Sequence, residues 1–499
     1  MEHTLDMIKQ YAKSGEYRRV PISRELYADA FTPIEVMRTL RAASRHCYLL
    51  ESAEDKQQWG RYSFLGYAPT MEITCTNGSL TIRAGKEEEE KSEQVIETRT
   101  PETFIRQILD EYKSPRLDAM PPFTGGLVGY FSYDYIKYAE PVLRPLLEED
   151  TGSREFRDID LMLFDRVIVF DHYRQKLILI IGVSLSGSLE ENYQNALEEL
   201  SEMERLIRSG AKADFKPLAL EEAFSPCIPQ ADYCQIVEKA KNYIYEGDIF
   251  QVVLSNPLTA KAKGSLFDTY RVLRTSNPSP YMFYFSSDDI EVAGASPETL
   301  VKLDNGKLTT FPLAGTRPRG KTDEEDKRLE AELLSDEKEC AEHNMLVDLG
   351  RNDLGKISLP GSVRVDKYMA IERFSHVMHI GSTVSGRLAP DKDALDAIRS
   401  VLPAGTLSGA PKIRACEIIA ELEERKRGIY GGAIGYLDFT GNMDTCISIR
   451  LAYKKNGIVC VQSGAGIVAD SIPENEFQEC QNKAGAVIQA LKTAEGGLK

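Results

Sequence analysis

Two acidic clusters far apart in the chain constrain its fold more than any other feature. The first is Asp336-Glu337-Lys338-Glu339, with His343 following at helical spacing, and the second is Glu476-Phe477-Gln478-Glu479. Carboxylates three residues apart lie on one side of a helix, so two such helices can converge on one hard cation and leave positions open for substrate oxygens. The fold must then bring both helices together. The pattern predicts a Mg2+-dependent enzyme that acts on a small carboxylate.

The second cluster lies near the start of a predicted C-terminal helix. Ser471 and Glu474 have the spacing of a capping box, and Pro473 falls in the first turn, where its missing N–H is harmless. Glu476 and Glu479 fall on one edge of the apolar stripe, so we expect both to be half-buried and to repel each other unless a cation lies between them. The alternative is an exposed acidic edge that complements the helix dipole. The stripe itself consists of Phe477, Cys480, Ala484, Val487, Ile488 and Leu491.

The first cluster lies on another predicted helix with the same arrangement. Its apolar face contains Leu329, Leu333, Cys340 and Val347, together with Asp336 and His343, and Glu339 lies at the border. Acidic side chains on an apolar face need a partner. That partner is a cation shared with the other cluster or, alternatively, a salt bridge to Lys338 or Arg351.

Three glycine-rich stretches are suited to binding an anion. Gly315–Gly320 (GTRPRG) combines a hydroxyl group, backbone N–H groups and the guanidiniums of Arg317 and Arg319, which can pair with a carboxylate. Gly405–Lys412 (GTLSGAPK) places Pro411 at a predicted helix start and suggests an anion-binding nest. Ser463–Gly466 resembles part of a dinucleotide fingerprint, but the predicted helix after it runs to the C-terminus without the further strand and acid of a Rossmann unit. We therefore exclude NAD binding.

Histidine offers a candidate acid or base rather than a metal site. His376 and His379 would face different ways on a strand, so we do not expect them to bind one metal ion together. One of them can act as a general acid or base because imidazole titrates near neutral pH. The alternative is an ordinary core or surface histidine.

Composition limits the possible partners and the compartment. The 499 residues carry a formal net charge of −16, which argues against nucleic acid or an anionic membrane surface as the main partner. The nine cysteines show no C-x-x-C pair, and the first residues lack the apolar core of a signal peptide. The longest apolar run, Leu177–Val183, is short enough for a buried strand. We therefore expect a cytoplasmic protein.

Strand and helix patterns divide the chain into two predicted domains. β-type runs dominate the first half, and 190–208 has the periodicity of a helix. Residues 209–230 lose this periodicity and gain Pro and Gly, so we place a linker there, between domains at 15–208 and 231–492. A helix is predicted over Tyr233–Tyr245 and a strand over Asp248–Leu254. Because no clean βαβ repeat follows, the predicted fold class is α+β.

The order of these motifs resembles the chorismate-utilising enzymes, and among them the anthranilate synthase branch. The resemblance is dense over residues 230–490 and looser before 230. It implies a fold of two large antiparallel sheets packed as a β-sandwich, with helices outside. The matching stretches are Gly247–Leu254 (GDIFQVVL), Ala295–Glu298 (ASPE), Phe311–Gly320 (FPLAGTRPRG), Asp336–Gly355 (DEKECAEHNMLVDLGRNDLG), His376–Ser382, Gly405–Lys412, Gly431–Tyr436 and Ser463–Glu479.

The resemblance also implies roles for individual residues. Mg2+ would be held by Glu339 and Glu479, with Asp336 and Glu476 nearby. Glu298 would protonate the leaving hydroxyl group, and His379 rather than His376 would serve the later elimination of pyruvate. Chorismate would contact Gly315, Thr316, Tyr430, Arg450, Gly464, Ala465 and Gly466. L-Tryptophan would bind as a feedback inhibitor at Ser52, Pro280, Tyr281 and Met282.

Two positions separate the sister activities of this family. Relatives that make aminodeoxychorismate carry Lys where this chain has Ala314, and those that activate water carry Lys where it has Gln251. Because this chain has neither lysine, the resemblance implies a site suited to ammonia as the nucleophile, with Gln251 as one of the catalytic residues. The chain shows no glutaminase nucleophile elbow, so we expect ammonia from a separate glutamine amidotransferase subunit. The alternatives are an aminodeoxychorismate synthase large subunit and a regulatory subunit without turnover.

Overall fold

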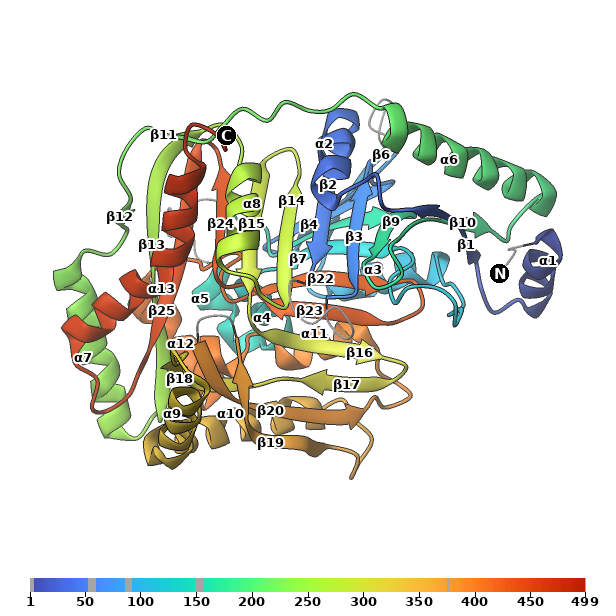
Figure 1. The fold of residues 1–499 in the computed structure, drawn as a ribbon. Helices are drawn as coiled ribbons and strands as arrows, with labels where there is room; N and C mark the ends of the chain where they lie inside the picture. The colour runs from blue at the N-terminus through green and yellow to red at the C-terminus, as the bar shows by residue number, and fades with distance from the viewer. Residues whose placement is uncertain (1–3, 53–59, 86–91, 149–155, 375–376, 499) are drawn as a thin grey trace.

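Two large antiparallel sheets form the centre of the molecule, and helices cover their outer faces (Figure 1). The computed structural model describes residues 4–52, 60–85, 92–148, 156–374 and 377–498. In Figure 1 the strands β13, β15, β14 and β2 run up the view, whereas β16, β17 and β20 run across it, so strands of the two sheets cross. The architecture confirms the predicted α+β class and the predicted sandwich of two antiparallel sheets.

The first sheet contains strands from both ends of the chain. Its order is β1 (Arg19–Tyr27), β10 (Lys176–Ser184), β9 (Arg166–Asp171), β3 (Tyr62–Tyr67), β2 (Cys47–Glu51), β14 (Tyr281–Ser286), β15 (Ile290–Ser296), β24 (Leu451–Lys455), β25 (Ile458–Ile467), β13 (Gln251–Lys263) and β11 (Ala219–Leu220). The short strands β12 (Ser225–Pro226) and β21 (Gly409–Ala410) also pair with β13.

The second sheet has a similar mixture of early and late strands. Its order is β18 (Leu313–Pro318), β20 (Val377–Arg387), β17 (Lys307–Thr310), β16 (Thr299–Asp304), β23 (Met443–Ile447), β22 (Ala433–Asp438), β7 (Gly126–Phe131), β8 (Ile159–Phe164), β4 (Met71–Thr76), β5 (Ser79–Ala84) and β6 (Ser92–Glu97). Strand β19 (Arg364–Arg373) pairs with β20.

Helices lie on the outer side of each sheet. The α-helices are α1 (Leu5–Ser14), α2 (Pro33–Ala43), α3 (Pro101–Glu111), α4 (Ile136–Ala139), α5 (Arg144–Glu148), α6 (Leu189–Ser209), α7 (Gln230–Glu246), α8 (Phe267–Ser276), α9 (Asp323–Ser335), α10 (Glu337–Gly355), α11 (Ala394–Val401), α12 (Lys412–Glu423) and α13 (Pro473–Ala494). Short 3-10 turns are η1 (Tyr133–Tyr135), η2 (Pro141–Leu143) and η3 (Gly405–Leu407). Helices α2, α6, α8 and α13 pack on the first sheet, and α10 and α11 pack on the second.

Aromatic side chains fill the space between the sheets. Tyr48 and Phe64 of the first sheet meet Phe164 and Tyr436 of the second, and Phe123 packs among them. The ring centroids of Tyr48 and Phe164 lie 4.7 Å apart, and those of Phe123 and Tyr436 lie 4.4 Å apart. Large rings suit this position because packed sheets stand about 10 Å apart.

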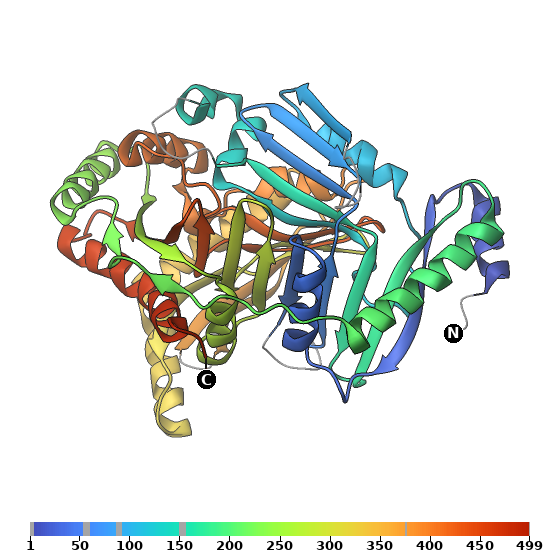
Figure 2. The same ribbon diagram turned by 90° about the horizontal axis from the view of Figure 1, so that it is seen from above.

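The predicted linker does not divide the strands into two separate sheets, because each sheet contains strands from before and after it. Residues 209–230 connect α6 to α7 and contain β11 and β12. Strand β2, from before the linker, pairs with β14 from after it, and β7 pairs with β22 in the same way. The view from above shows α6 and α1 together at the end of the molecule that carries β1 and β10 (Figure 2).

The predicted strand over Asp248–Leu254 begins later than expected. Gly247 ends α7 in the left-handed conformation (φ 85°), and the carboxylate of Asp248 accepts hydrogen bonds from the Arg414 guanidinium. β13 therefore starts at Gln251 and continues to Lys263. A glycine at this place is favoured because it adopts positive φ without strain.

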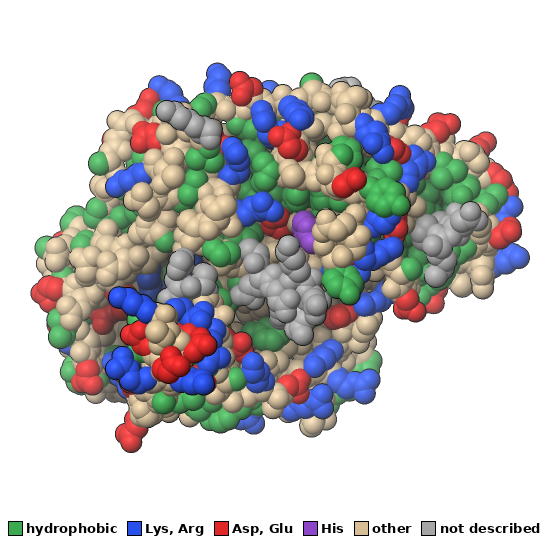
Figure 3. All heavy atoms as spheres, viewed as in Figure 1, with side chains coloured by type: hydrophobic (Ala, Val, Ile, Leu, Met, Phe, Trp, Pro, Cys, Tyr) green, Lys and Arg blue, Asp and Glu red, His purple; other side chains and the backbone are tan. Residues whose placement is uncertain are grey.

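The outer surface is mixed in charge. On the face shown in Figure 3, Lys and Arg side chains are interspersed with Asp and Glu side chains rather than gathered into separate patches. Within the described residues, none of the helices combines the length and the apolar content that a membrane crossing requires.

Candidate active site

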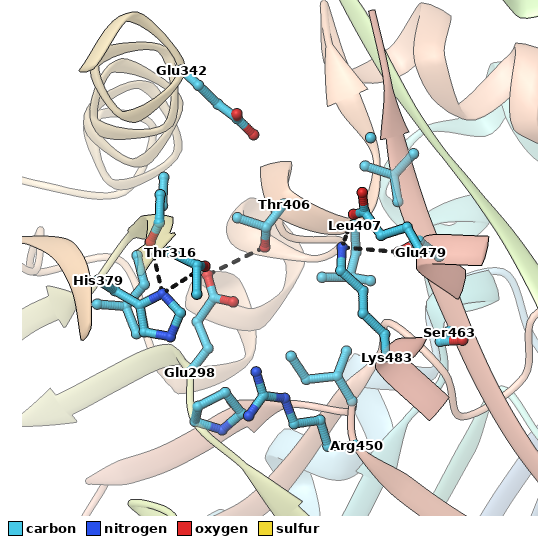
Figure 4. Close-up of a pocket in the computed structure, with 18 of the residues that line it drawn as sticks. Glu298, Thr316, Glu342, His379, Thr406, Leu407, Arg450, Ser463, Glu479 and Lys483 are labelled. Carbon is cyan, nitrogen blue, oxygen red and sulfur yellow. Dashed lines mark hydrogen bonds and ion pairs between the residues drawn. The ribbon is translucent and has the colours of Figure 1, made fainter. Parts of the chain in front are cut away.

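A cavity of about 950 Å3 brings together most of the predicted site residues. The walls come from the start of β13, the strands β18, β20 and β25, and the helices α10 and α13. Figure 4 shows Glu298 between His379 and Arg450, while Glu342 and Glu479 reach the cavity from separate helices. The predicted residues that line it are Gln251, Glu298, Gly315, Thr316, Glu339, His379, Tyr430, Arg450, Gly464, Gly466, Glu476 and Glu479.

Several predicted residues lie outside the cavity wall. Ala465 does not line the cavity, because alternation along β25 turns its fully buried side chain into the core beside α7 and α13, away from the face of Gly464 and Gly466. Asp336 is also absent from the wall. The segment predicted for tryptophan lies nearby but outside it, and His376 falls outside the described residues.

The first acidic cluster does not lie within one helix, which corrects the prediction. The chain breaks at Asp336, which ends α9 and caps α10 by accepting hydrogen bonds from the backbone N–H groups of Lys338 (3.1 Å) and Glu339 (3.2 Å). These bonds hold the pKa of Asp336 below its usual range. A side chain with this capping role is directed toward the backbone, so Glu339 reaches the cavity whereas Asp336 does not.

The partner of these acids is an arginine that the sequence predicted as an anion grip. The Arg317 guanidinium contacts Asp336 at 3.0 Å, Glu339 at 3.4 Å and Glu332 at 3.1 Å. The predicted salt-bridge partners of the cluster, Lys338 and Arg351, are therefore wrong for this conformation. Arg317 is held by carboxylates and does not line the cavity.

Arg319 of the predicted anion grip, and Lys412 at the end of the predicted nest, are also engaged elsewhere. Arg319 pairs with Asp326 at 2.6 Å and donates to the carbonyl of Phe374. Lys412 pairs with the buried Asp353 at 2.6 Å. These carboxylates hold both side chains, and neither lines the cavity, so Arg319 does not form the predicted anion grip in this structure.

The capping box predicted for α13 is absent. Ile472 occupies the N-cap position without a side-chain hydrogen bond, while the Ser471 hydroxyl accepts from the backbone N–H of Val468. Pro473 does lie in the first turn, as predicted. Glu476 is half-buried, but the side chain of Glu479 is 47% exposed and pairs with Lys483 at 2.7 Å. The expectation that both would be half-buried therefore holds only for Glu476.

Four carboxylates from α10 and α13 face the cavity: Glu339, Glu342, Glu476 and Glu479. Burial raises the pKa of Glu339, with repulsion from Glu342 adding to it, and burial likewise raises the pKa of Glu476, with a contribution from Glu479. Oxygen-only ligands of this kind are those that Mg2+ prefers. The donor set therefore fits a hard divalent cation, whose charge would offset the mutual repulsion.

His379 is positioned by the glycine-rich turn at β18. Its Nδ1 lies 2.8 Å from the carbonyl oxygen of Gly315 and 3.1 Å from the hydroxyl of Thr316. When Nδ1 donates to that carbonyl, Nε2 is left for proton transfer with a bound molecule. Burial lowers the pKa of His379, which favours the neutral imidazole.

Glu298 is the most strongly perturbed acid of the cavity. It lies between β15 and β16 and is 8% exposed, and its carboxylate accepts a hydrogen bond from the Thr406 hydroxyl at 3.2 Å. Burial raises its pKa to about 8, although Arg450 opposes the shift. A carboxyl group with this pKa is protonated at neutral pH and can donate a proton. Arg450 itself is held at a positive φ of 51°, a strained conformation for a non-glycine residue.

Two glycines of β25 are needed for close packing at the cavity wall. A Cβ atom on Gly466 would lie 2.5 Å from Nε2 of Gln251, and one on Gly464 would lie 2.7 Å from the carbonyl oxygen of Leu254 and 3.0 Å from the hydroxyl of Tyr430. The absence of side chains therefore lets Gln251 and Tyr430 reach the cavity.

Sequence reasoning missed three residues of the cavity. Glu342 lies three positions after Glu339 on α10, and its carboxylate is 3.4 Å from Nε2 of Gln251. Lys483 lies four positions after Glu479 and donates to the carbonyl of Gly464 at 3.1 Å. Thr406 holds Glu298. The helical spacing of the first two was a usable signal, whereas Thr406 depends on tertiary contact alone.

The two segments predicted to bind tryptophan are adjacent. In the antiparallel pair β2–β14, Glu51 lies opposite Met282, so the next positions along the register are Ser52 and Tyr281. Pro280 immediately precedes β14 and follows Asn277–Ser279, which line the cavity. The candidate regulatory segment is therefore continuous in sequence with one wall of the candidate active site.

Comparison with known proteins points to the same chemistry. A family model described as chorismate binding enzyme matches residues 45–489. The chain is 46% identical to anthranilate synthase component 1 of Acetivibrio thermocellus, with 98% of each chain covered, and 43% identical to that of Aquifex aeolicus, with 97% of this chain and 96% of the relative covered. The crystal structure of anthranilate synthase component I from Streptococcus pneumoniae matches with a TM-score of 0.71 and 42% identity, over 86% of this chain and 92% of that one. A menaquinone-specific isochorismate synthase from Escherichia coli, 20% identical, shares the fold with a TM-score of 0.68 over 98% of both chains.

Proposed function

This chain belongs to the chorismate-binding enzyme family, and we propose that it is an anthranilate synthase large subunit that aminates chorismate with ammonia and then eliminates pyruvate. One observation carries the choice among sister activities. Gln251 and Ala314, the two positions at which other branches are expected to carry lysine, both line the cavity. A cavity wall without an amine at either position lacks the lysines that the sister activities are expected to use as covalent nucleophile or as base for water, and this favours ammonia as the nucleophile.

Substrate binding follows from the polar groups of the cavity wall. Chorismate is a dianion, so Arg450 and the backbone around Gly464 and Gly466 are suited to its enolpyruvyl side, with Tyr430 next to them. When bound by Glu339 and Glu479, with Glu476 nearby, Mg2+ supplies charge neutralisation at the ring carboxylate. Gly315 and Thr316 contact the substrate from the side of His379.

Two protein groups move protons in the proposed reaction. As ammonia forms a bond to C2, the C4 hydroxyl group leaves with the C–O bond electrons, and Glu298 donates the proton that converts it to water. The raised pKa of Glu298 supports this role. In the second step the ring loses the C2 proton and the enolpyruvyl group leaves as pyruvate, and Nε2 of His379 serves as the acid–base group there. The product ring is aromatic.

Ammonia supply and regulation are further parts of the proposal. A separate glutamine amidotransferase subunit supplies the ammonia, and ammonium salts at high concentration replace it. L-Tryptophan binds between Ser52 and Pro280–Met282 and acts through Asn277–Ser279, which continue into the cavity wall. Binding there favours one arrangement of the two sheets over another.

The test is an activity assay of the isolated chain with chorismate, ammonium and Mg2+, followed by fluorescence and product mass. We expect anthranilate and pyruvate in equal amounts. A 4-amino product that keeps the enolpyruvyl group would identify an aminodeoxychorismate synthase instead. Absence of any product from a chain that still binds tryptophan would identify a regulatory subunit.

The metal ligands are tested separately in the same assay. Glu339→Gln is expected to abolish Mg2+-dependent turnover, because an amide oxygen is neutral and cannot replace the carboxylate charge. Glu324→Gln, an exposed change in the first turn of α9, is the control and should keep full turnover. Equal turnover in both variants would show that Glu339 is not a ligand of the catalytic Mg2+.

A further inference from the structure

A histidine and two carboxylates meet at one end of the sandwich, outside the cavity described above. His46 lies between α2 and β2, Asp288 lies in the turn between β14 and β15, and Glu72 lies on β4 of the other sheet. One ligand atom from each residue lies within 4.8 Å of the other two. None of these residues lines the cavity of the candidate active site.

The strand register explains why these side chains face each other. β2 and β14 are paired, with Cys47 opposite Ser286, so His46 and the β14–β15 turn lie at the same end of the first sheet (Figure 1). His46 lies two residues before Tyr48 and therefore faces the same side of the first sheet, where the Tyr48 ring packs between the sheets. Glu72 lies opposite Met162 on the second sheet, and Met162 packs in the same layer. His46 and Glu72 therefore meet from opposite sheets across the interior layer.

The separations match ligand atoms around a metal ion. Nε2 of His46 lies 3.4 Å from Oε1 of Glu72 and 3.6 Å from Oδ2 of Asp288. An N–H···O hydrogen bond is usually about 2.7–3.2 Å long, and one ring N–H points at only one acceptor at a time. Around a tetrahedral ion with bonds of about 2.1 Å, the ligand atoms lie about 3.4 Å apart. A single ion can bind both carboxylates, whereas the single ring N–H of His46 can donate to only one of them.

In the described part of the chain, charged side chains of both signs surround this cluster. Asp160 and Asp289 lie close by, and Arg157 and Lys455 contact them at 2.8–3.4 Å. Arg83, opposite Glu72 in the β4–β5 register, pairs with Glu93. Burial raises the pKa of Asp160, and the charge of Glu72 adds to the effect. The carboxylates around the cluster therefore repel one another, and a bound cation would reduce that repulsion.

We propose that His46, Glu72 and Asp288 form a binding site for a divalent transition-metal ion of the zinc class, which joins the two sheets at this end. An imidazole with two carboxylates is a ligand set for such ions rather than for Mg2+. His46 is 2% exposed and Glu72 8%, while the side chain of Asp288 is 55% exposed. Solvent can thus reach the ion beside Asp288 and supply a fourth ligand.

The site stabilises the folded chain by linkage. Its ligands come from two sheets, so the unfolded chain does not present them together, and an ion that binds only the folded state raises the unfolding temperature. The proposal does not depend on the proposed activity, because turnover does not pass through these residues.

The test is a Co2+ titration of the full chain, after removal of bound metals, in excess Mg2+ to saturate oxygen-only sites. We expect visible absorption bands of a four- or five-coordinate Co2+ ion, which Zn2+ displaces, and a rise in unfolding temperature with Zn2+. Asp288→Asn is the main variant because its exposed position makes misfolding a small risk. It should weaken Co2+ binding more than about tenfold, since outer-sphere partners alone account for about 10–100-fold.

Asp289→Asn provides a matched control in the same turn. Its carboxylate pairs with Arg157 and Lys455, so the change should leave the Co2+ bands and the Zn2+ effect intact. His46→Gln should remove the bands, and all three variants should keep ammonium-dependent turnover. The proposal is overturned if the native chain shows no such bands, or if Asp288→Asn and the native chain bind Co2+ equally well.

Discussion

At the residue scale, Glu298 combines burial with a position in the cavity wall, and this predicts the pH dependence of turnover. The protonated carboxyl group is the active form, and its pKa is raised to about 8. At a constant concentration of free ammonia, we expect kcat/KM for chorismate to be level below about pH 8 and to fall about tenfold per unit above it. Glu298→Gln should lower turnover at every pH and remove this alkaline limb, as measured by initial rates between pH 6 and about 9.5. An unchanged alkaline limb in the variant would assign the titration to another group.

The raised pKa of Glu298 also predicts that the stability of the folded chain depends on pH. Because the folded pKa of Glu298 is raised from 4.5 to about 8, the folded chain retains a proton that the unfolded chain releases in this range. Stability is therefore lost as pH rises through this window and toward the folded pKa. Relative to Glu298→Gln, the native chain should lose on the order of a few kcal/mol of unfolding free energy between pH 5 and about pH 9 in denaturant titrations, at about 1.4 kcal/mol for each pH unit between the unfolded and folded pKa values. Parallel pH profiles of the two proteins would contradict this.

Arg317 is a competitor for the proposed metal site. Its guanidinium contacts Glu339, one of the expected metal ligands, and Asp336. Arg317→Gln removes that competing charge, so we expect Mg2+ to bind about three- to tenfold more tightly in calorimetry, or Mn2+ in spin-resonance titrations. Arg319→Gln is the control, because Arg319 pairs with Asp326 instead. Weaker metal binding by Arg317→Gln alone would show that Arg317 positions Glu339.

At the element scale, the break between α9 and α10 decides which acids reach the cavity. Asp336 caps α10 and thereby directs Glu339 and Glu342 along the helix toward α13. Asp336→Ala should lower the free energy of unfolding by about 1 kcal/mol, because the cap is lost, whereas Asp336→Ser should retain most of it. Chemical denaturation measures both.

The same pair of variants separates capping from metal ligation. Serine caps a helix but lacks the negative charge of a carboxylate. If Asp336 acts only as a cap, Asp336→Ser should keep the native affinity for Mg2+. A large loss of affinity in this variant, with stability preserved, would place Asp336 among the ligands.

At the scale of the whole molecule, both sheets are shared between the two halves of the chain. β2 pairs with β14, and the residues before β14 line the cavity, so a ligand at Ser52 contacts a strand pair that leads to the site. Ser52→Ala should raise the tryptophan concentration for half-inhibition about tenfold and leave turnover without tryptophan unchanged, as is typical of a lost coupling of about 1–3 kcal/mol. An unaltered inhibition curve would place the regulatory site elsewhere.

Local patterns determined much of this protein. The periodicity over 190–208 predicted α6, and the apolar run Leu177–Val183 predicted β10, because the repeat of 3.6 or 2 residues is written in neighbouring side chains. The acids at helical spacing and the glycines of β25 were equally visible, and the structure brings them to one cavity. These features depend on residues only a few positions apart.

Tertiary contacts decided the rest. Arg317 turns from its predicted role in binding an anion to the carboxylates of Glu332, Asp336 and Glu339, which lie on or between other elements. Ser471 was predicted as a helix cap but accepts a hydrogen bond from the preceding turn, and Ala465 faces the core because of the register of β25 with β13. Such outcomes depend on which distant groups compete for the same charge, hydrogen bond or space, and only the folded chain sets that competition.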